Sequence, residues 1–285
     1  MIFYQITFGL YNKKTYEAAE ELIDEYLSML KSRGQIDKHY NIVPWQGQVV
    51  AYVNALGLTA DRQKSHCESG KERLKKVLEF FGQMPVWTCN EDFPTKKNAT
   101  WKNAPFLSFF AHSFDYESPV CRGDNGLVIP YFTLPIADME RESIYRWANQ
   151  YRDFYDVWLN SGELEIQSYR LLAEPDSSLS VEGRECSAVI EKTTGVPTYY
   201  YLMRYYGREE AEEKARRCPG CGKPWLIKRP EKPIDEHKPC WEFDFMCKRC
   251  RLVSHCACRH SLYPQPRYAK IGEPRKKTQS PKRER

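Results

Sequence analysis

The chain has 285 residues, 41% of them hydrophobic and 14% aromatic, and a net charge of +5. This composition predicts a sizeable core and excludes a wholly disordered protein, and the length suits one large domain or two smaller ones. No apolar run reaches the roughly 18 residues that a membrane helix needs, and residues 1–14 lack the basic leader of a secretory signal. We therefore expect a cytoplasmic protein with no membrane partner.

The first hundred or so residues predict alternating strands and helices. Alternating apolar side chains indicate strands over residues 2–10, 48–56 and 85–89. A helix is predicted from Thr15, which can cap it, to Ser32, and a second helix is predicted over residues 71–81, before Gly82. Residues 90–103 are polar and indicate a loop.

The middle of the chain predicts further strands and then long helices. Residues 106–114 and 127–132 have strand patterns, and Gly123-Asp-Asn-Gly126 indicates a turn before the second of them. Helices are predicted over residues 137–160 and 180–194, and strands over residues 164–172 and 198–206. Strands that alternate with helices, together with several consecutive strands, predict an α+β fold with a mixed sheet.

Two closely spaced cysteine pairs stand near the C-terminus. Cys218-Pro-Gly-Cys221 is followed, after 25 intervening residues, by Cys247-Lys-Arg-Cys250. A gap of two residues lets both sulfurs of one tight turn face a single ion, and four such ligands suit tetrahedral zinc. Apolar residues that leave the first turn and alternate into the second predict a small antiparallel sheet. The pattern is that of a zinc ribbon with one structural Zn²⁺.

Other cysteines and histidines surround these pairs. Their side chains are of the types that bind metal, and they are His237, Cys240, His255, Cys256, Cys258 and His260. The Cys-Ala-Cys spacing lacks the geometry of a metal-binding turn, so a second zinc site is not expected. Seven of the eleven cysteines lie between residues 218 and 258, and the total is odd. This distribution favours reduced thiols and metal over disulfides, which also fits the cytoplasm.

The charge is unevenly distributed along the chain. Residues 216–285 contain 19 lysines and arginines against seven acidic residues, a balance of +12, so residues 1–215 carry −7. A basic C-terminal quarter points to nucleic acid or another polyanion. The candidate contacts are Arg216, Arg217, Lys223, Lys248, Arg249 and Arg251 at the cysteine pairs, Arg275, Lys276 and Lys277 in the tail, and Trp225 or Trp241 for stacking on bases.

A simpler interpretation of the same residues stays open. The basic side chains can offset the charge of four thiolates, and the two tryptophans can form the core of the small sheet. The chain is thus expected to have three parts: an α+β body over residues 1–207, a ribbon with its linker over 208–263, and a disordered basic tail over 264–285.

Nothing in the body predicts catalysis. His112 lies near Asp115 and Glu117, but a histidine near carboxylates is more often structural. The chain has no phosphate-binding loop, no dinucleotide-binding glycine motif and no His-Glu-x-x-His helix. No catalytic residue is therefore predicted, and an enzyme with a site around His112 remains only an alternative.

The run from Arg217 to Gly222 with Trp225, and residues 243–254, resemble the ribbon of a bacterial family of uncharacterised zinc-ribbon proteins. Residues 195–204 are similar to the segment that precedes the ribbon in that family. A nucleic-acid-binding role has been suggested for the family on the strength of its ribbon. The resemblance implies a zinc ion but little about mechanism.

The sequence favours RNA or ribonucleoprotein over a defined DNA sequence, because no recognition helix is evident. The alternative is a protein-interaction adaptor, or an immunity or defence component, that uses the ribbon as a docking surface for a protein partner.

Overall fold

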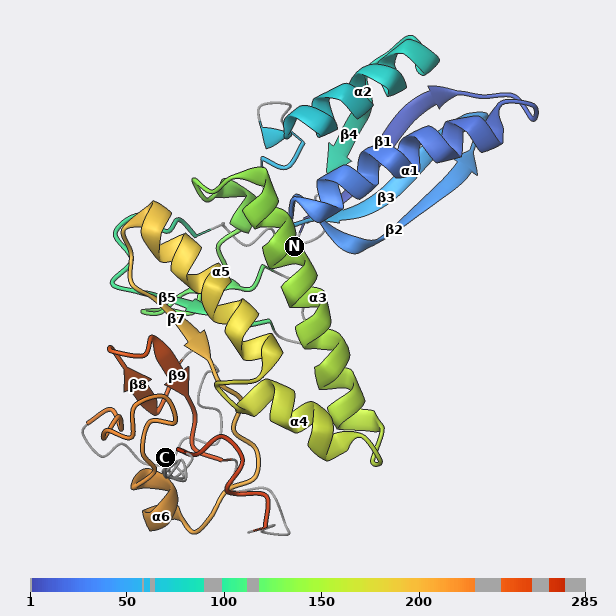
Figure 1. Cartoon of the computed structure of the whole chain (residues 1–285). Helices are drawn as coiled ribbons and strands as arrows, with labels where there is room; N and C mark the ends of the chain where they lie inside the picture. The colour runs from blue at the N-terminus through green and yellow to red at the C-terminus, as the bar shows by residue number, and fades with distance from the viewer. Residues whose placement is uncertain are drawn as a thin grey trace, which may run out of the picture. The chain divides into compact units, whose positions relative to one another are not determined.

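The protein folds into two compact units (Figure 1) in a computed structural model that describes residues 2–57, 59–61, 65–89, 99–111, 118–228, 242–257 and 267–274. The first unit comprises Met1–Asp153 and Glu185–Thr198, and the second comprises Phe154–Arg184 and Tyr199–Arg285. Helices α3 (Asp138–Asn160) and α5 (Ser178–Thr194) contribute residues to both units. No helix in these ranges is long and apolar enough to cross a membrane.

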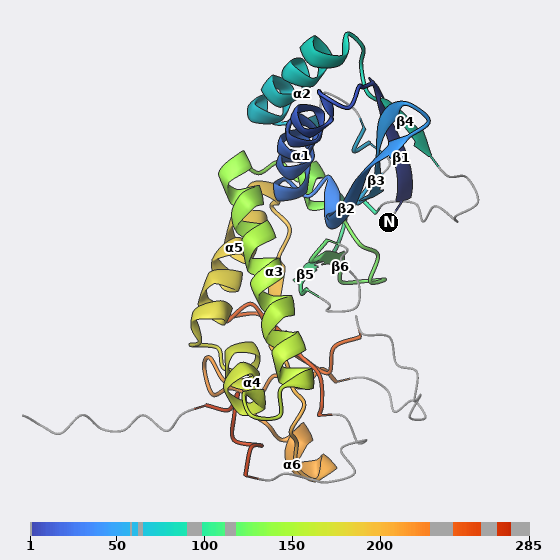
Figure 2. The same cartoon turned by 90° about the vertical axis from the view of Figure 1, so that its right-hand side faces the viewer.

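The first unit starts with a four-stranded sheet and two helices. In chain order these are β1 (Ile2–Leu10), α1 (Tyr16–Ser32), β2 (Ile36–Trp45), β3 (Gln48–Ala55), α2 (Glu68–Phe81) and β4 (Val86–Cys89). The strands pair antiparallel in the order β2-β3-β1-β4. This βαββαβ connectivity is that of a ferredoxin-like fold, and Figure 2 shows both helices on one side of the sheet.

Apolar side chains at helical and strand spacing fill the space between the sheet and the helices. Helix α1 buries Ile23, Tyr26, Leu27 and Leu30, which share one face, and β1 buries alternate residues such as Ile6. The β2–β3 hairpin is closed by Gln46 and Gly47, both with positive φ (48° and 78°). Such a two-residue turn matches the twist of the strands that it joins.

The rest of the first unit has a β-hairpin and part of two helices. Strands β5 (Leu107–Phe109) and β6 (Val120–Arg122) pair antiparallel, and the 3-10 helix η2 (Tyr131–Thr133) follows. The rings of Phe109 and Trp147 lie 4.3 Å apart in the core. Position 34 requires glycine, because a Cβ atom there would lie 2.0 Å from the Tyr131 ring.

The second unit contains short helices and the ribbon strands. They are α4 (Glu165–Ala173), β7 (Thr198–Tyr201), α6 (Glu210–Lys214), β8 (Phe245–Cys247) and β9 (Leu252–Ser254). Strand β9 pairs antiparallel with β8 and parallel with β7, where Tyr200 lies opposite Leu252. The ribbon therefore shares a sheet with the strand that precedes it, and the predicted boundary at residue 207 falls inside this unit.

The predicted α+β class is confirmed, although several predicted elements differ. Residues 165–172, which were predicted as part of a strand, belong to helix α4, and β2 was not predicted. Residues 127–132 contribute an isolated bridge at Val128 and part of η2 instead of a strand. Part of the predicted disordered tail is ordered, since Ala269 and Ile271 are buried.

Candidate metal centre and basic surface

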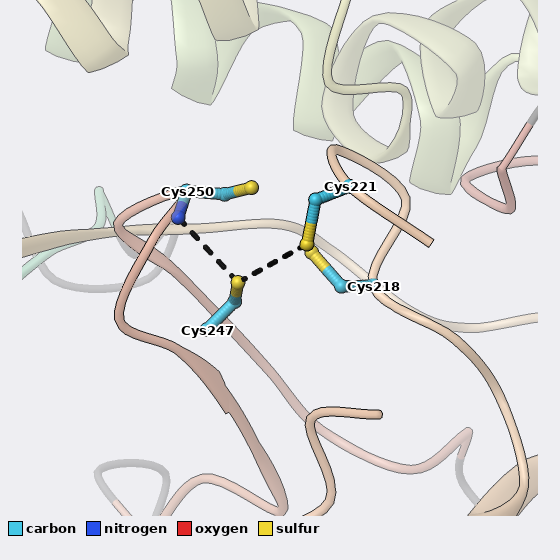
Figure 3. A group of neighbouring side chains, drawn as sticks. All are labelled: Cys218, Cys221, Cys247 and Cys250. Atoms are coloured by element: carbon cyan, nitrogen blue, oxygen red, sulfur yellow. Dashed lines mark hydrogen bonds between the residues drawn. The ribbon is translucent and has the colours of Figure 1, made fainter. Parts of the chain in front are cut away.

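The four cysteines of the two pairs come together in the second unit (Figure 3). Their Sγ atoms all lie within 4.8 Å of one another, and the Sγ atoms of Cys221 and Cys247 are 3.7 Å apart. Cys218 and Cys247 are buried, and Cys221 and Cys250 are half-buried. The structure thus assembles the predicted tetrad, and these sulfurs could hold a metal ion.

Tight turns hold the sulfurs in place, and we call residues 218–223 and 247–251 the cysteine turns. In the first, the amide of Cys218 donates to the Lys223 carbonyl (2.9 Å) and that of Gly222 donates to the Cys218 carbonyl (2.8 Å). Gly222 ends its cysteine motif in the left-handed region, with φ 70°, where glycine is favoured. The equivalent residue of the second turn is Arg251, with φ 51°.

The thiols differ in their readiness to ionise. Burial raises the pKa of Cys218, and it also raises the pKa of Cys250 to about 11. A hydrogen bond from the backbone of Lys223 lowers the pKa of Cys221 to about 7. A cation that binds all four sulfurs as thiolates must therefore displace protons from the buried thiols.

Arg216 and Trp225, two of the predicted nucleic-acid contacts, form the core of the ribbon instead. Trp225 is 3% exposed and Arg216 is 6% exposed. The guanidinium of Arg216 lies over the rings of Trp225 (4.9 Å) and Phe245 (4.5 Å), and it donates to the Ser254 hydroxyl (3.2 Å). The structure therefore corrects these two predictions, because neither side chain can reach a ligand on the surface.

Arg251 also has a structural partner. Its guanidinium lies 5.3 Å from the centre of the Tyr199 ring and donates to the Lys248 carbonyl (3.1 Å). The side chain is half-buried and fastens the second cysteine turn to β7. Arg251 is thus positioned by the fold rather than extended into solvent.

The remaining basic residues of the cysteine turns form an exposed cluster, which we call the basic surface. It consists of Arg217 and Lys223 on the first turn and its flank, and Lys248 and Arg249 on the second turn. All four side chains are exposed, and within the described ranges none makes an ion pair or a side-chain hydrogen bond. By contrast, Arg204, Arg208, Lys214 and Arg170 in the same unit are all paired with carboxylates.

Several predicted site residues lie outside the described residues. They are Trp241, the tail residues Arg275, Lys276 and Lys277, the ligand types His237, Cys240, Cys258 and His260, and also His112 with Asp115 and Glu117. His255 and Cys256 are described. The ring of His255 stacks on Phe243, with centroids 5.2 Å apart, and the Cys256 amide donates to the Asp244 carboxylate (2.8 Å).

A buried ion pair that the sequence did not predict supports this region. Arg204 donates from Nε and Nη2 to the two carboxylate oxygens of Glu213, both at 2.7 Å. Its Nη1 donates to the carbonyls of Ala269 and Ile271, each at 2.9 Å. The pair thus ties residues 267–274 to the ribbon. No pattern in the sequence marks which glutamate of the charged run 209–213 is buried.

Two family models match this chain. One describes a "Domain of unknown function (DUF2310)" and matches residues 102–203, and the other describes a "Domain of unknown function (DUF8594)" and matches residues 207–260, which include the tetrad. No solved structure matches the chain.

Two similar proteins come from Haemophilus influenzae strain Rd, and both are described as "Uncharacterized protein". Each is 32% identical over 166 residues, which is 58% of this chain. The matched part covers 78% of the first relative and 60% of the second. On this evidence the chain belongs to the uncharacterised bacterial family that carries the domain of unknown function DUF2310.

Proposed function

We propose that the second unit is a zinc ribbon that binds nucleic acid, RNA or ribonucleoprotein in preference to a defined DNA sequence. The observation that carries this proposal is the basic surface. Arg217, Lys223, Lys248 and Arg249 are exposed, make no ion pair with any residue that the structure describes, and lie on two turns that one metal site would hold together. Lysine and arginine side chains in this state are available to phosphates.

The spacing of the sulfurs supports zinc as the metal. Zinc–thiolate bonds of about 2.3 Å in a tetrahedron place the sulfurs about 3.8 Å apart. The 3.7 Å between Cys221 and Cys247, and the 4.8 Å limit for the whole set, fit that geometry. Four protein ligands leave no open position for water, so the ion would stabilise the fold and would not catalyse a reaction.

The basic surface has a simpler explanation that must be tested against this one. Four thiolates around one zinc ion leave a local charge of about −2, and nearby cations offset it. That role requires charge near the sulfurs but no phosphate. Phosphate binding releases counterions from the nucleic acid, whereas offsetting the thiolate charge does not. Only phosphate binding therefore predicts an affinity for nucleic acid that falls steeply as the salt concentration rises.

Binding of a fluorescent single-stranded RNA to the zinc-loaded protein tests the proposal. Replacing all four residues of the basic surface by glutamine should weaken binding at least tenfold at low salt, because four phosphate contacts are lost. The matched control replaces four exposed lysines of the first unit, Lys71, Lys75, Lys76 and Lys192, by glutamine. It removes the same charge and should bind as the parent does.

Equal loss in both variants would mean that total charge alone drives binding, and no binding by the parent to RNA or DNA at any salt concentration would refute the proposal. Metal analysis should find one zinc per chain. A stoichiometric protein partner that co-purifies after nuclease treatment would favour the adaptor alternative.

A further inference from the structure

The side of the four-stranded sheet opposite α1 and α2, which we call the outer face, carries partly exposed aromatic rings on its two central strands. Phe3 on β1 and Tyr52 on β3 are half-buried, and their rings stack with centroids 5.8 Å apart at an angle of 7°. Their register partners, Asn54 and Gln5, are on the same face, because residues directly opposite in a ladder share a face. Figure 2 shows the two helices on the other side of this sheet.

Groups that can bind the edges of bases flank the rings. One row across the sheet reads Asn41, Tyr52, Gln5 and Thr88, from β2 to β4. The Gln5 side chain is half-buried, and its amide has no hydrogen-bond partner in the part of the chain that the structure describes. An amide beside an aromatic ring offers donor and acceptor atoms to a base that is stacked on that ring.

A third ring lies at one end of the same face. Trp45 on β2 and Leu10 on β1 flank Gln48 in one row, and they are 54% and 75% exposed. Gln48 and Tyr52 are four residues apart on β3, which corresponds to about 13 Å along the strand. The outer face thus extends from the Phe3–Tyr52 pair to an exposed tryptophan.

Charge separates the two sides of this sheet. Asp37 is the sole acidic residue of the four strands, and its side chain is 3% exposed. The carboxylate accepts hydrogen bonds from the His39 amide and from Asn54 (3.2 Å). Helix α1, on the opposite side, carries five acidic residues: Glu17, Glu20, Glu21, Asp24 and Glu25. A polyanion is repelled by α1 and meets no exposed carboxylate from the strands.

We propose that the outer face binds single-stranded nucleic acid by stacking bases on Tyr52 and Phe3, with Gln5 bonding to base edges. Four-stranded sheets that recognise RNA stack two or three bases on aromatic side chains in this way. Stacking needs exposed base faces, which a duplex hides, so the outer face selects single strands. The inference rests on the proposed nucleic-acid-binding function and adds a second, base-contacting surface to the basic surface.

The test compares full-length variants on a fluorescent single-stranded RNA and on its duplex. Replacing both rings, as Phe3→Leu with Tyr52→Leu, keeps apolar side chains on the sheet and removes the stacking surfaces. Binding of the single strand should weaken about tenfold or more, with the duplex unchanged. The matched control is Tyr11→Leu with Tyr16→Leu, another ring pair of this unit (5.2 Å apart), which packs against the helix-side core.

Ultraviolet cross-linking of the unmodified protein to the single strand gives a second readout, which does not depend on the folding of a variant. Cross-links should map to Phe3 and Tyr52. If the ring variant binds the single strand as the parent does, and cross-links map elsewhere, the inference is overturned. The proposed function would still stand if the glutamine variant of the basic surface loses binding.

The opposite pattern separates the two proposals. If the ring variant loses binding and the basic-surface variant does not, the ribbon proposal fails and the outer face remains. Sedimentation at increasing protein concentration tests a different occupant of this face. A dimer that the ring substitutions dissociate would assign the outer face to a second copy of the chain and overturn the inference.

Discussion

Glu213 carries a buried negative charge in the second unit. Its side chain is 4% exposed, and it holds the buried guanidinium of Arg204 through two hydrogen bonds. Arg216 Nε also lies 3.3 Å from this carboxylate. Removing one partner of a buried pair leaves an uncompensated charge, which commonly costs 3–5 kcal/mol.

We therefore expect Glu213→Gln to lower the free energy of unfolding by roughly 3–5 kcal/mol. Urea titration at neutral pH of the zinc-loaded protein measures it. The neighbouring Glu212 is exposed on the same short helix, so Glu212→Gln should change stability by less than about 0.5 kcal/mol. Equal effects of the two substitutions would show that Glu213 does not act through the buried pair.

The same carboxylate predicts a loss of stability in acid. Burial by itself would raise the pKa of Glu213, but Arg204 and Arg216 reverse this and hold it below its ordinary 4.5. A depressed pKa contributes stability that is fully present above the unfolded value and is lost as the pH falls through the folded value. The difference in stability between the parent and Glu213→Gln should thus be constant above about pH 5.5 and should shrink below pH 4.5. A constant difference down to pH 3 would contradict this.

Arg251 has the left-handed backbone conformation that Gly222 has at the equivalent position of the other cysteine turn. A non-glycine residue in the left-handed region costs roughly 1–2 kcal/mol. Contacts with Tyr199 and Lys248 offset that cost here. Replacement by alanine removes the side-chain contacts but keeps the Cβ atom, and replacement by glycine removes both. Comparing the two separates the cost of the backbone conformation from the contribution of the contacts.

Arg251→Ala should be destabilising, and Arg251→Gly should be more stable than Arg251→Ala by about 1 kcal/mol, because glycine relieves the strain. Thermal unfolding of the zinc-loaded variants measures the order. Arg249 has no positive φ, so there glycine should be the less stable of the same two replacements. The same order at both positions would refute the backbone argument.

At the scale of elements, the sequence predicts those helices and strands whose apolar residues keep a regular helical or strand spacing throughout. The apolar stripes of α1 and α2 place both helices within three residues of the observed starts. Residues 164–172 mislead because Leu164, Ile166 and Leu172 occupy alternate positions as in a strand, whereas Tyr169, Leu172 and Ala173 form the buried helical stripe. Strand β2 escapes detection because a register shift between Ile36 and Tyr40 and three polar residues interrupt its alternation.

The candidate site divides in the same way. Spacing alone predicts the tetrad, because ligand type and turn length specify a tetrahedral site. Which of the predicted basic and aromatic residues are exposed depends instead on their burial in the folded protein. Whether Arg216 or Arg217 reaches solvent depends on the packing of Trp225 and Phe245, which no local pattern encodes. Eight of the residues predicted for metal or nucleic acid belong to the two cysteine turns, and Arg217 lies next to them, so the sequence located the region but not which of its side chains are exposed.

We expect the ribbon strands to be the elements that depend on the proposed zinc ion. Strands β8 and β9 have three residues each, too few to be stable by themselves. Zinc binding by four thiolates contributes about 10–16 kcal/mol, more than the stability of most domains. Chelation should therefore raise hydrogen exchange in residues 245–254 by orders of magnitude and leave β1 and β3 protected.

Mutants of single cysteines provide the controls for that measurement. Cys247→Ser removes a buried ligand and should reproduce the effect of the chelator. Cys121→Ser changes a cysteine outside the tetrad and should retain the metal and the exchange pattern of the parent. Unchanged exchange in residues 245–254 after complete metal removal would show that the small sheet does not depend on an ion.

For the whole molecule, the separation of charge along the chain makes salt the decisive variable. Residues 216–285 carry +12 and the rest carries −7, so net charge alone conceals the attraction to a polyanion. For single strands the slope of log affinity against log salt is about −0.7 per phosphate neutralised. Replacing the four residues of the basic surface by glutamine should therefore make the slope less steep by about 3.

Fluorescence anisotropy at five or six salt concentrations gives this slope, and the lysine variant of the first unit is again the control. The affinities of the basic-surface variant and the parent should differ most at low salt and converge as the salt concentration rises. Salt screens the attraction between these side chains and phosphates, which is the same attraction that the substitutions remove. The ring variant of the outer face should lose affinity by the same factor at every salt concentration, since stacking neutralises no phosphate. Parallel lines for parent and basic-surface variant would mean that these four side chains bind no phosphate.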